Sequence, residues 1–298
     1  MAAPPLRPIR DAVRLALRED LADGDATTTA LFPSPIVARA HIVAEQRLVA
    51  AGIAVARAVF TAVDKRLRVV RAVRDGAQVG VGARVMTVEG DARSLLMAER
   101  TALNFLQRLS GIATLTARYC EAVRGSRVLI LDTRKTTPGL RALEKWAVRL
   151  GGGANHRMSL GDGLLIKDNH LALWRASPGQ GPAEACRRAR RVAPRRLPLV
   201  VEAKTLQEVR EALAGQPDII LLDNMKVRTI RKAVALIDGR ALVEVSGGVT
   251  LDNVRAIAAA GPDRISIGAL THSAPAANVS MDLIPLKTVR ATTGRSRS

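Results

Sequence analysis

Six short apolar runs in the second half of the chain, each closed by polar residues or glycine, constrain its fold more than any other feature. Between residues 127 and 269 these runs are RVLILD, GLLIKD, LVVEAK, DIILLDN, ALVEVSGG and RISIGA. Helical patterns separate them, near residues 140–150, 182–193, 205–214, 226–238 and 250–260. Strands that alternate with helices over short connections predict right-handed βαβ units and a parallel sheet.

The residues that close these runs favour an α/β barrel over an open, doubly wound sheet. In a barrel the carboxyl ends of all strands share one face, and that face carries the functional site. An open sheet binds its ligand only where the strand order reverses. Because polar or glycine residues close every run, we expect the barrel, and the open sheet remains the alternative.

The first ninety residues follow a different pattern. Strands are expected at residues 36–44, 67–73 and 84–88, with a helix at residues 52–63. This order predicts an α+β unit with a largely antiparallel sheet. Residues 20–33 indicate a connecting loop, and residues 94–124 indicate a helix that breaks near Ser110. We place the domain boundary close to Gly111.

Composition and charge limit the possible partners. The chain is 48% hydrophobic but only 2% aromatic, so a sizeable core must be built from Ala, Val, Leu and Ile. Its net charge of +19 could indicate nucleic-acid binding. However, the basic residues are mostly dispersed among acids, except at Arg187–Arg191, at Arg195–Arg196 and in the C-terminal tail, and aromatic side chains for base stacking are scarce. We therefore expect a solvated basic surface and no nucleic-acid partner.

Cysteine content and hydropathy favour a cytoplasmic protein. Cys120 and Cys186 have neither the number nor the spacing of a disulfide framework or a metal site. No apolar run approaches the ~20 residues that a membrane-spanning helix requires. The first residues lack the apolar stretch of a secretory signal. We expect no membrane partner.

A set of basic side chains forms the first candidate site. Its members are Arg100, Arg134, Lys135, His156, Arg157 and Lys167. Such a group could share a water-poor pocket only with anions to balance it. Arginine binds planar carboxylates through two parallel hydrogen bonds, and lysine supplies a compact charge. A ligand with two carboxylates, or with a phosphate, would fit; the alternative is that each residue is an ordinary surface charge.

Two carboxylates form the second candidate site. Glu202 and Asp223 close apolar runs on consecutive predicted strands. Paired carboxylates at adjacent strand ends suit a Mg²⁺ ion or the hydroxyl groups of a ribose. The alternative is a structural ion pair with Lys204 or Lys167.

Two glycine-containing loops form the third. Ser246, Gly247 and Gly248 close one run, and Gly268 and Ala269 close the next. Backbone amides at helix starts bind phosphate, and the last loops of an α/β barrel are a frequent phosphate site. The alternative is a pair of tight turns without a ligand. Together the three sites predict a glycosyl-type transfer from an activated sugar phosphate to a carboxylated substrate.

Several exact strings are distinctive: ERTALNFLQRLSGIAT, LDTRKTTPGLRALEKWAVRLGGGANHR, LLIKDNH, LLDNM, SGGVTLDN and ISIGALTHSAPA. Together they closely resemble the quinolinate phosphoribosyltransferase family, also called nicotinate-nucleotide pyrophosphorylase (carboxylating). The resemblance extends from about Asp20 to Leu283. It implies that quinolinate and phosphoribosyl pyrophosphate, with Mg²⁺, give nicotinate mononucleotide, pyrophosphate and CO₂ on the route to NAD. A related enzyme for another carboxylated ring is the close alternative.

The resemblance also implies the fold and the assembly. The type II phosphoribosyltransferase fold combines a seven-stranded open α/β barrel, expected at residues 111–273, with an N-terminal α+β sandwich domain. That domain would comprise residues 1–110 joined by residues 274–298. A homodimer with composite active sites is implied. Since only six strands are evident, we expect the seventh near residues 157–160.

Finally, the resemblance implies a role for each site residue. Thr133, Arg134, Lys135, His156, Arg157 and Lys167 would hold quinolinate, with Arg100 from the partner subunit. Glu202 and Asp223 would serve the ribose and the metal, and these two with Lys135 would be catalytic. Ser246, Gly247, Gly248, Gly268, Ala269 and His272 would hold phosphate. One departure is visible: Val200 stands where many relatives carry a glutamate, and Lys204 is also unusual.

Overall fold

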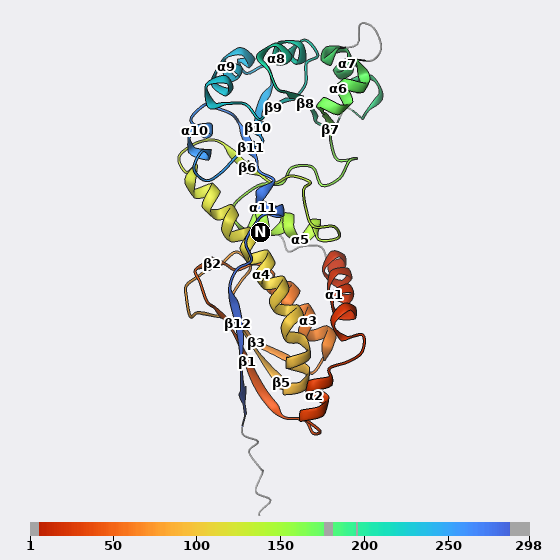
Figure 1. Ribbon diagram of the computed structural model, residues 1–298, viewed down its shortest axis with the longest axis vertical. Coiled ribbons are helices and arrows are strands. Elements are labelled where there is room, and N and C mark those ends of the chain that lie inside the picture. The colour runs from red at the N-terminus through yellow and green to blue at the C-terminus, as the bar shows by residue number, and fades with distance from the viewer. Residues whose placement is uncertain (1–5, 176–180, 195, 287–298) are drawn as a thin grey trace, which may run out of the picture. The chain divides into compact units, whose positions relative to one another are not determined.

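The computed structural model describes residues 6–175, 181–194 and 196–286. The chain divides into two compact units, which are Met1–Gly111 with Ala276–Ser298 (unit 1) and Ile112–Pro275 (unit 2). The dividing point in the first half lies within the long helix α4, Ala92–Ala122 (Figure 1). The basic C-terminal tail lies outside the described residues. Within those residues, no helix combines the length and the apolar character needed to cross a membrane.

Unit 1 contains a four-stranded antiparallel sheet with the order β12-β1-β5-β3. Its strands are β1 (Val37–Ala44), β3 (Arg68–Ala72), β5 (Arg84–Asp91) and β12 (Val279–Pro285). The last strand of the chain therefore pairs with the first, and Figure 1 shows the two side by side. The short strands β2 (Leu48–Val49) and β4 (Gln78–Val79) form a separate pair.

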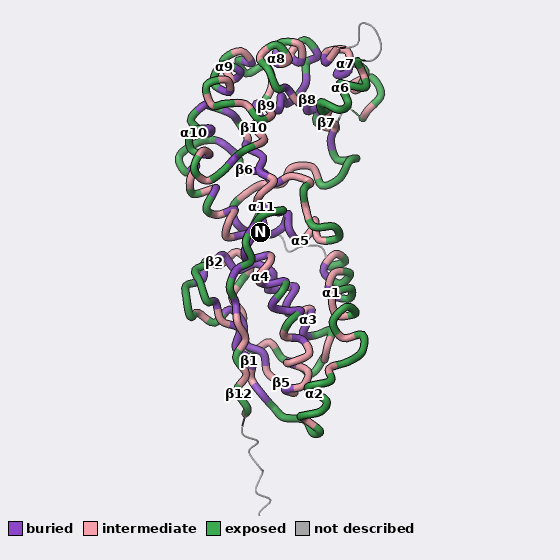
Figure 2. The backbone as a smooth tube through the Cα atoms, in the orientation of Figure 1, coloured by how far each residue is buried: buried purple, intermediate pink, exposed green. Residues whose placement is uncertain are grey.

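Alternation along β1 directs one face of this sheet into the core of unit 1. Ala38, Ala40, Ile42 and Ala44 are all at most 2% exposed. Helices α1 (Leu6–Leu21), α2 (Ala26–Leu31) and α3 (Ile53–Val63) belong to the same unit. Figure 2 shows the resulting buried stretches on α3 and β1. Small and branched apolar side chains build this core, as the scarcity of aromatic residues predicts.

Two local predictions for unit 1 are wrong. The expected loop at residues 20–33 contains helix α2, whose start is capped because the Asp25 carboxylate accepts the Thr28 backbone N–H at 2.9 Å. The expected break near Ser110 is absent, and α4 is continuous. The Ser110 hydroxyl bonds the backbone N–H and carbonyl of Ala51, at 3.0 and 3.1 Å, so it does not compete for the helix's own backbone groups.

Unit 2 contains a six-stranded parallel sheet with the order β6-β11-β10-β9-β8-β7. Its strands are β6 (Leu129–Leu131), β7 (Leu164–Ile166), β8 (Leu199–Ala203), β9 (Ile219–Asp223), β10 (Leu242–Ser246) and β11 (Arg264–Ser266). All six strands predicted from the apolar runs are confirmed. Because the first strand pairs with the last, the sheet curls into a barrel.

Helices surround this barrel. They are α5 (Arg141–Leu150), α6 (Asp168–Trp174), α7 (Pro182–Val192), α8 (Leu206–Leu213), α9 (Val227–Ile237), α10 (Val254–Ala258) and α11 (Ala269–His272). In Figure 1 the run from α7 to α9 lies outside the strands β8 to β10. This arrangement buries both faces of the strands, which explains why their sequences are nearly continuous apolar runs.

The seventh strand position is not where the sequence analysis placed it. Residues 157–160 form no strand. Instead Ala154 makes an isolated parallel bridge with Leu131, on the free edge of β6. A single bridging residue gives no apolar run, which is why the pattern missed it. Among the described residues no pairing links Ala154 to β7, so the barrel is open between them.

Candidate active site

A cavity of about 300 Å³ lies within unit 2, among residues from the carboxyl ends of the strands. Nine of its lining residues were predicted as site residues: Thr133, Arg134, Lys135, His156, Arg157, Lys167, Glu202, Asp223 and Ser246. Leu165, Leu221, Glu244 and Ser266 complete the lining. The fold thus brings together the predicted cations of unit 2 and both predicted carboxylates.

Strand register explains how the floor of this cavity is built. Glu202, Leu221 and Glu244 are neighbours across β8, β9 and β10. Two residues further along, Asp223 and Ser246 are neighbours in the same way. Paired residues on parallel strands face the same side, and residues two apart on one strand share a face. Both rows therefore project into the barrel.

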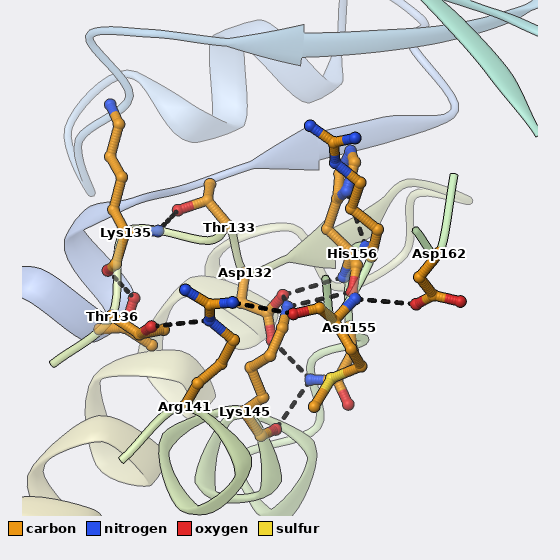
Figure 3. Close-up of polar contacts among 12 residues, drawn as sticks. Asp132, Thr133, Lys135, Thr136, Arg141, Lys145, Asn155, His156 and Asp162 are labelled. Carbon is orange, nitrogen blue, oxygen red and sulfur yellow. Dashed lines mark hydrogen bonds and ion pairs between the residues drawn. The ribbon is translucent and has the colours of Figure 1, made fainter. Parts of the chain in front are cut away.

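A buried ion pair supports the loop that follows β6. Asp132 and Lys145, from α5, are 0% and 1% exposed, and the Lys145 ammonium contacts a carboxylate oxygen of Asp132 (Figure 3). The same carboxylate accepts the side-chain amide of Asn155 and, at 2.9 Å, the backbone N–H of His156. Burial raises the pKa of Asp132 and lowers that of Lys145, and the contact between them opposes both shifts.

This network joins two segments that line the cavity. Besides Asp132, the Lys145 ammonium donates to the backbone carbonyl of His156 at 3.0 Å. Asp132 directly precedes the residues Thr133, Arg134 and Lys135. The ion pair consequently fixes the start of that segment against the backbone of His156. The Lys135 side chain extends away from the ion pair in Figure 3.

Two arginines form part of the cationic wall of the cavity. Arg157 donates to the backbone carbonyl of Gly163 at 2.8 Å. Burial and the neighbouring charge of Arg134 lower the pKa of Arg157. The Nε of Arg134 is buried and has no hydrogen-bond partner among the described residues. Two crowded guanidinium groups, one with an unused buried donor, are suited to an anionic ligand.

The ring of His156 is held on both sides. Its Nδ1 accepts the backbone N–H of Arg157 at 2.8 Å. Its Nε2 lies 3.3 Å from Oε1 of Glu244, a carboxylate that is 0% exposed. The sequence analysis treated His156 as one of the cations and assigned no site role to Glu244.

The two predicted carboxylates do not form the structural ion pair that was their alternative explanation. No cation lies within ion-pair distance of Glu202 or Asp223 among the described residues. Lys204 instead contacts Asp168 at 2.6 Å, which raises the pKa of Lys204. Burial, and then the charges of Asp223 and Asp168, raise the pKa of Glu202.

The described residues contain no group of three or more His, Cys, Asp or Glu side chains that could hold a metal ion. Two carboxylates on the cavity lining are nevertheless compatible with magnesium. Mg²⁺ keeps several waters and commonly binds one or two carboxylates together with substrate phosphates. Glu202 and Asp223, both on the cavity lining, could supply those carboxylates.

The glycine loops lie beside the cavity rather than on its lining. Gly247 has φ +88°, and a Cβ there would lie 2.4 Å from Oδ1 of Asn224. At Gly268 a Cβ would lie 3.0 Å from Nε2 of His272 and 3.1 Å from Cδ of Lys135. Gly247 therefore needs glycine, whereas at Gly268 a Cβ would require the neighbouring side chains to move by a few tenths of an ångström. The other predicted phosphate residues outside the lining are Gly248, Ala269 and His272.

Arg100 is the predicted site residue that belongs to unit 1. It lies on α4, its side chain is 61% exposed, and its guanidinium is 4.0 Å from the carboxylate of Glu99. It does not line the cavity of unit 2.

The sequence analysis assigned no site role to the residues that hold the lining residues in place. Glu244 was noted with Ser246 as a polar residue of the run ALVEVSGG but was given no site role, although it lies two residues before Ser246 on the same strand face. Asp132 was seen to end a strand, but its partners Lys145 and Asn155 are 13 and 23 residues away along the chain. Their convergence depends on the three-dimensional fold and leaves no local signal.

Comparisons with known proteins agree over both units. Family models described as the N-terminal and C-terminal domains of quinolinate phosphoribosyl transferase match residues 25–110 and 112–282. Nicotinate-nucleotide pyrophosphorylase [carboxylating] of Mycobacterium leprae is 45% identical over 280 residues, which cover 92% of this chain and 96% of that protein. The probable Bacillus subtilis counterpart is 40% identical, with 89% and 90% covered.

Solved structures lead to the same family. The nicotinate-nucleotide pyrophosphorylase of Francisella tularensis has a TM-score of 0.89 at 35% identity, covering 95% of this chain and 98% of that one. NadC from Streptococcus pyogenes has a TM-score of 0.89 at 40% identity, covering 96% and 100%. The chain therefore belongs to the quinolinate phosphoribosyltransferase family.

Proposed function

We propose that the cavity of unit 2 is the active site of a decarboxylating quinolinate phosphoribosyltransferase. As a member of this family, the chain is an enzyme of NAD biosynthesis that acts on quinolinate and phosphoribosyl pyrophosphate. The products are nicotinate mononucleotide, pyrophosphate and CO₂. The observation that carries the assignment of the site is one cavity that joins a cationic wall to two strand-end carboxylates.

The cationic wall suits the two adjacent carboxylates of quinolinate. Arg134 and Arg157 can each grip a planar carboxylate, and Lys135 and Lys167 add compact charges. Thr133 and His156 complete the lining on this side. Holding the ring in one orientation places its nitrogen for attack, which converts an encounter between two substrates into a step within one complex.

The carboxylates suit the charge that develops during transfer. As pyrophosphate leaves, C1 of the ribose becomes partly positive, and the ring nitrogen of quinolinate then bonds to it. Glu202 and Asp223 would stabilise that positive charge, and they would also bind ribose hydroxyls. Mg²⁺, when bound, neutralises charge on the departing pyrophosphate.

The decarboxylation follows from the positive charge that the ring nitrogen acquires when the new bond forms. The ring nitrogen becomes cationic, so the electron pair released when the adjacent carboxylate leaves as CO₂ is stabilised beside it. The carbon then takes up a proton. This route needs no covalent enzyme intermediate, which agrees with the absence of a nucleophile motif in the sequence.

The remaining assignments belong to the same proposal. Ser246 with Gly247 and Gly248, and Gly268 with Ala269 and His272, would hold the phosphate of the phosphoribosyl group. The position of Ser246 on the cavity lining, and the close approach of Gly268 to Lys135 of the same lining, support this role. A cytoplasmic location stays a prediction.

A homodimer with composite active sites is also part of the proposal, with Arg100 acting in the partner's site. The exposure of Arg100, its place in unit 1 and its absence from the residues that line the cavity support this role. A two-fold dimer would then contain two equivalent composite sites.

The activity is tested by incubating the protein with quinolinate, phosphoribosyl pyrophosphate and Mg²⁺. We expect nicotinate mononucleotide and one CO₂ for each product formed. Nicotinate in place of quinolinate provides the specificity control. Folded protein that makes no product would contradict the assignment, and faster use of another carboxylated ring would favour the related-enzyme alternative.

The composite site is tested by mixing two variants, Arg100→Ala and Lys135→Ala, each expected to be nearly inactive. After subunit exchange, a mixed dimer would contain one site with both defects and one with neither. Activity should therefore return toward one intact site for each mixed dimer. If exchange is demonstrated by mass measurement and activity stays absent, Arg100 does not act across the dimer.

A further inference from the structure

Glu244 is a buried carboxylate in a position that folding alone does not explain. It lies on β10 at 0% exposure and lines the active-site cavity. Neither of its oxygens has a hydrogen-bond partner among the described residues. Among the described residues, the ring within ion-pair distance of Glu244 is that of His156, whose Nε2 lies 3.3 Å from Oε1, so that a small rotation of either side chain would align them for a hydrogen bond.

A carboxylate in such a place should lower the stability of the fold. Burying an ionised group without hydrogen bonds carries a large desolvation penalty. Replacing buried charged groups by apolar ones of similar volume often leaves stability unchanged or raises it. A residue that is unfavourable for folding and faces the substrate cavity is best explained by a role in that cavity.

The contacts of His156 indicate what that role is. Its Nδ1 accepts a backbone N–H from Arg157, so this nitrogen carries no proton. The single ring proton must then be on Nε2, which is the nitrogen that faces Glu244. Meanwhile the backbone of His156 is fixed by Asp132 and Lys145. Backbone and ring are therefore held from opposite sides.

We propose that Glu244 is a positioning residue that holds His156 as a neutral, oriented ring with its proton on Nε2. His156 then shapes the quinolinate subsite without adding a positive charge. The charge that attracts the dicarboxylate comes from Arg134, Arg157 and the two lysines of the lining. This inference rests on the proposed function, because it assigns quinolinate to the side of the cavity that His156 lines.

Two substitutions distinguish the role of the Glu244 oxygen as a hydrogen-bond acceptor from the role of its negative charge. Glu244→Gln keeps an oxygen that can accept the Nε2 proton but removes the negative charge. Glu244→Met keeps much of the volume and removes both. Glu211→Gln is the matched control, because Glu211 is a surface carboxylate paired with Arg175 at 3.6 Å and lies outside the cavity lining.

The direction of the change in quinolinate KM is the decisive readout. Simple repulsion between Glu244 and a dianion predicts that either substitution lowers this KM. Positioning predicts that Glu244→Met raises it by roughly ten- to hundredfold, the range of one charge-assisted hydrogen bond, while Glu244→Gln restores most of the affinity. The KM for phosphoribosyl pyrophosphate should stay unchanged, and the melting temperature of Glu244→Met should not fall.

The second measurement does not depend on activity. With ¹⁵N-labelled histidine, NMR should show the His156 ring with an unprotonated Nδ1 and a protonated Nε2 in the wild type and in Glu244→Gln. The chain has only four histidines, so His156→Gln assigns the signals. Glu244→Met should populate the other tautomer or the charged ring.

Several results would overturn the inference. One is a doubly protonated His156 ring in the wild-type protein, and another is a ring signal that is identical in Glu244→Met. A lower quinolinate KM in Glu244→Met would make Glu244 a repulsive charge only. A loss of both substrates together with a lower melting temperature would make its role structural. If the wild type makes no nicotinate mononucleotide while the tautomer behaves as expected, the proposed function fails and the Glu244–His156 contact stands.

Discussion

The buried pair of Asp132 and Lys145 gives the sharpest test of how this active site is supported. The substitution Lys145→Met keeps a long side chain in α5 but removes the ammonium group. Asp132 would keep the amide of Asn155 and the backbone N–H of His156 as donors, but no counter-charge. Removing one member of a buried ion pair is far more harmful than removing both, because it leaves an uncompensated charge.

The expected magnitude follows from the burial of both groups. Breaking a buried pair of this kind costs about 3–5 kcal/mol. Unfolding entropy is ~2.1 cal/mol/K per residue, or ~340 cal/mol/K for a unit of roughly 160 residues such as unit 2. The melting temperature should fall by about 9–15 °C if unit 2 unfolds alone, and by about half as much if the whole chain unfolds together. Differential scanning calorimetry measures this shift.

The pH dependence gives an independent check. Burial already raises the pKa of Asp132, and losing Lys145 should raise it further. A carboxylate whose pKa is higher in the folded than in the unfolded state destabilises the fold above its folded pKa and not below its unfolded value. The deficit of Lys145→Met should therefore shrink as the pH falls from neutral through the raised pKa of Asp132.

A double variant decides whether the charge is the cause. Asp132→Asn with Lys145→Met removes both charges and leaves an acceptor for the His156 N–H. It should be no less stable than Lys145→Met alone. The reasoning is refuted if the single variant loses less than about 1 kcal/mol, the size of an exposed pair, or if the two substitutions simply add. Because the pair also fixes the backbone of His156, quinolinate KM should rise in the single variant.

Three further substitutions test the cavity and its loops. Lys135→Ala should reduce kcat/KM for quinolinate by roughly ten- to hundredfold, since a charge-assisted contact is worth about 1.5–3 kcal/mol; unchanged kinetics would refute its assignment. Asp223→Asn should impair use of phosphoribosyl pyrophosphate and its Mg²⁺ dependence, whereas a selective loss of quinolinate binding would contradict its role. Gly247→Ala should raise the KM for phosphoribosyl pyrophosphate because its Cβ meets Asn224, while Gly239→Ala, also at positive φ but with open space, should not.

The barrel could be predicted because its strands carry a strong local signal. Each of the six strands lies in a mostly apolar run, and polar or small residues follow it at the end of the barrel that holds the cavity. The seventh position had no such signal because it consists of one bridging residue, Ala154. Its place depends on Gly153, where a Cβ would lie 2.8 Å from Thr116 and from Val148, so close packing fixes it rather than strand propensity.

Helix boundaries in unit 1 were predicted less well for a different reason. Ser110 and Gly111 favour a break in an isolated helix. In the folded chain the Ser110 hydroxyl is satisfied by Ala51, more than fifty residues earlier. The region around Asp25 had the residues of a helix cap, but the helix it starts is only six residues long and has little periodicity. A tertiary contact therefore keeps α4 continuous at Ser110, and the short length of α2 explains why it was not predicted.

The charges of the cavity explain why sequence reasoning found the cations and two carboxylates but assigned no role to Glu244 or Asp132. The sequence analysis balanced the cations with an external anion, whereas the structure shows that the protein supplies several carboxylates of its own. Glu202, Asp223 and Glu244 line the same cavity as the arginines and lysines, and Asp132 lies just behind it. Glu202 and Asp223 offset part of the positive charge of this cavity. They also divide the cavity into a basic side for a dicarboxylate and an acidic side for developing positive charge, which a set of cations alone could not do.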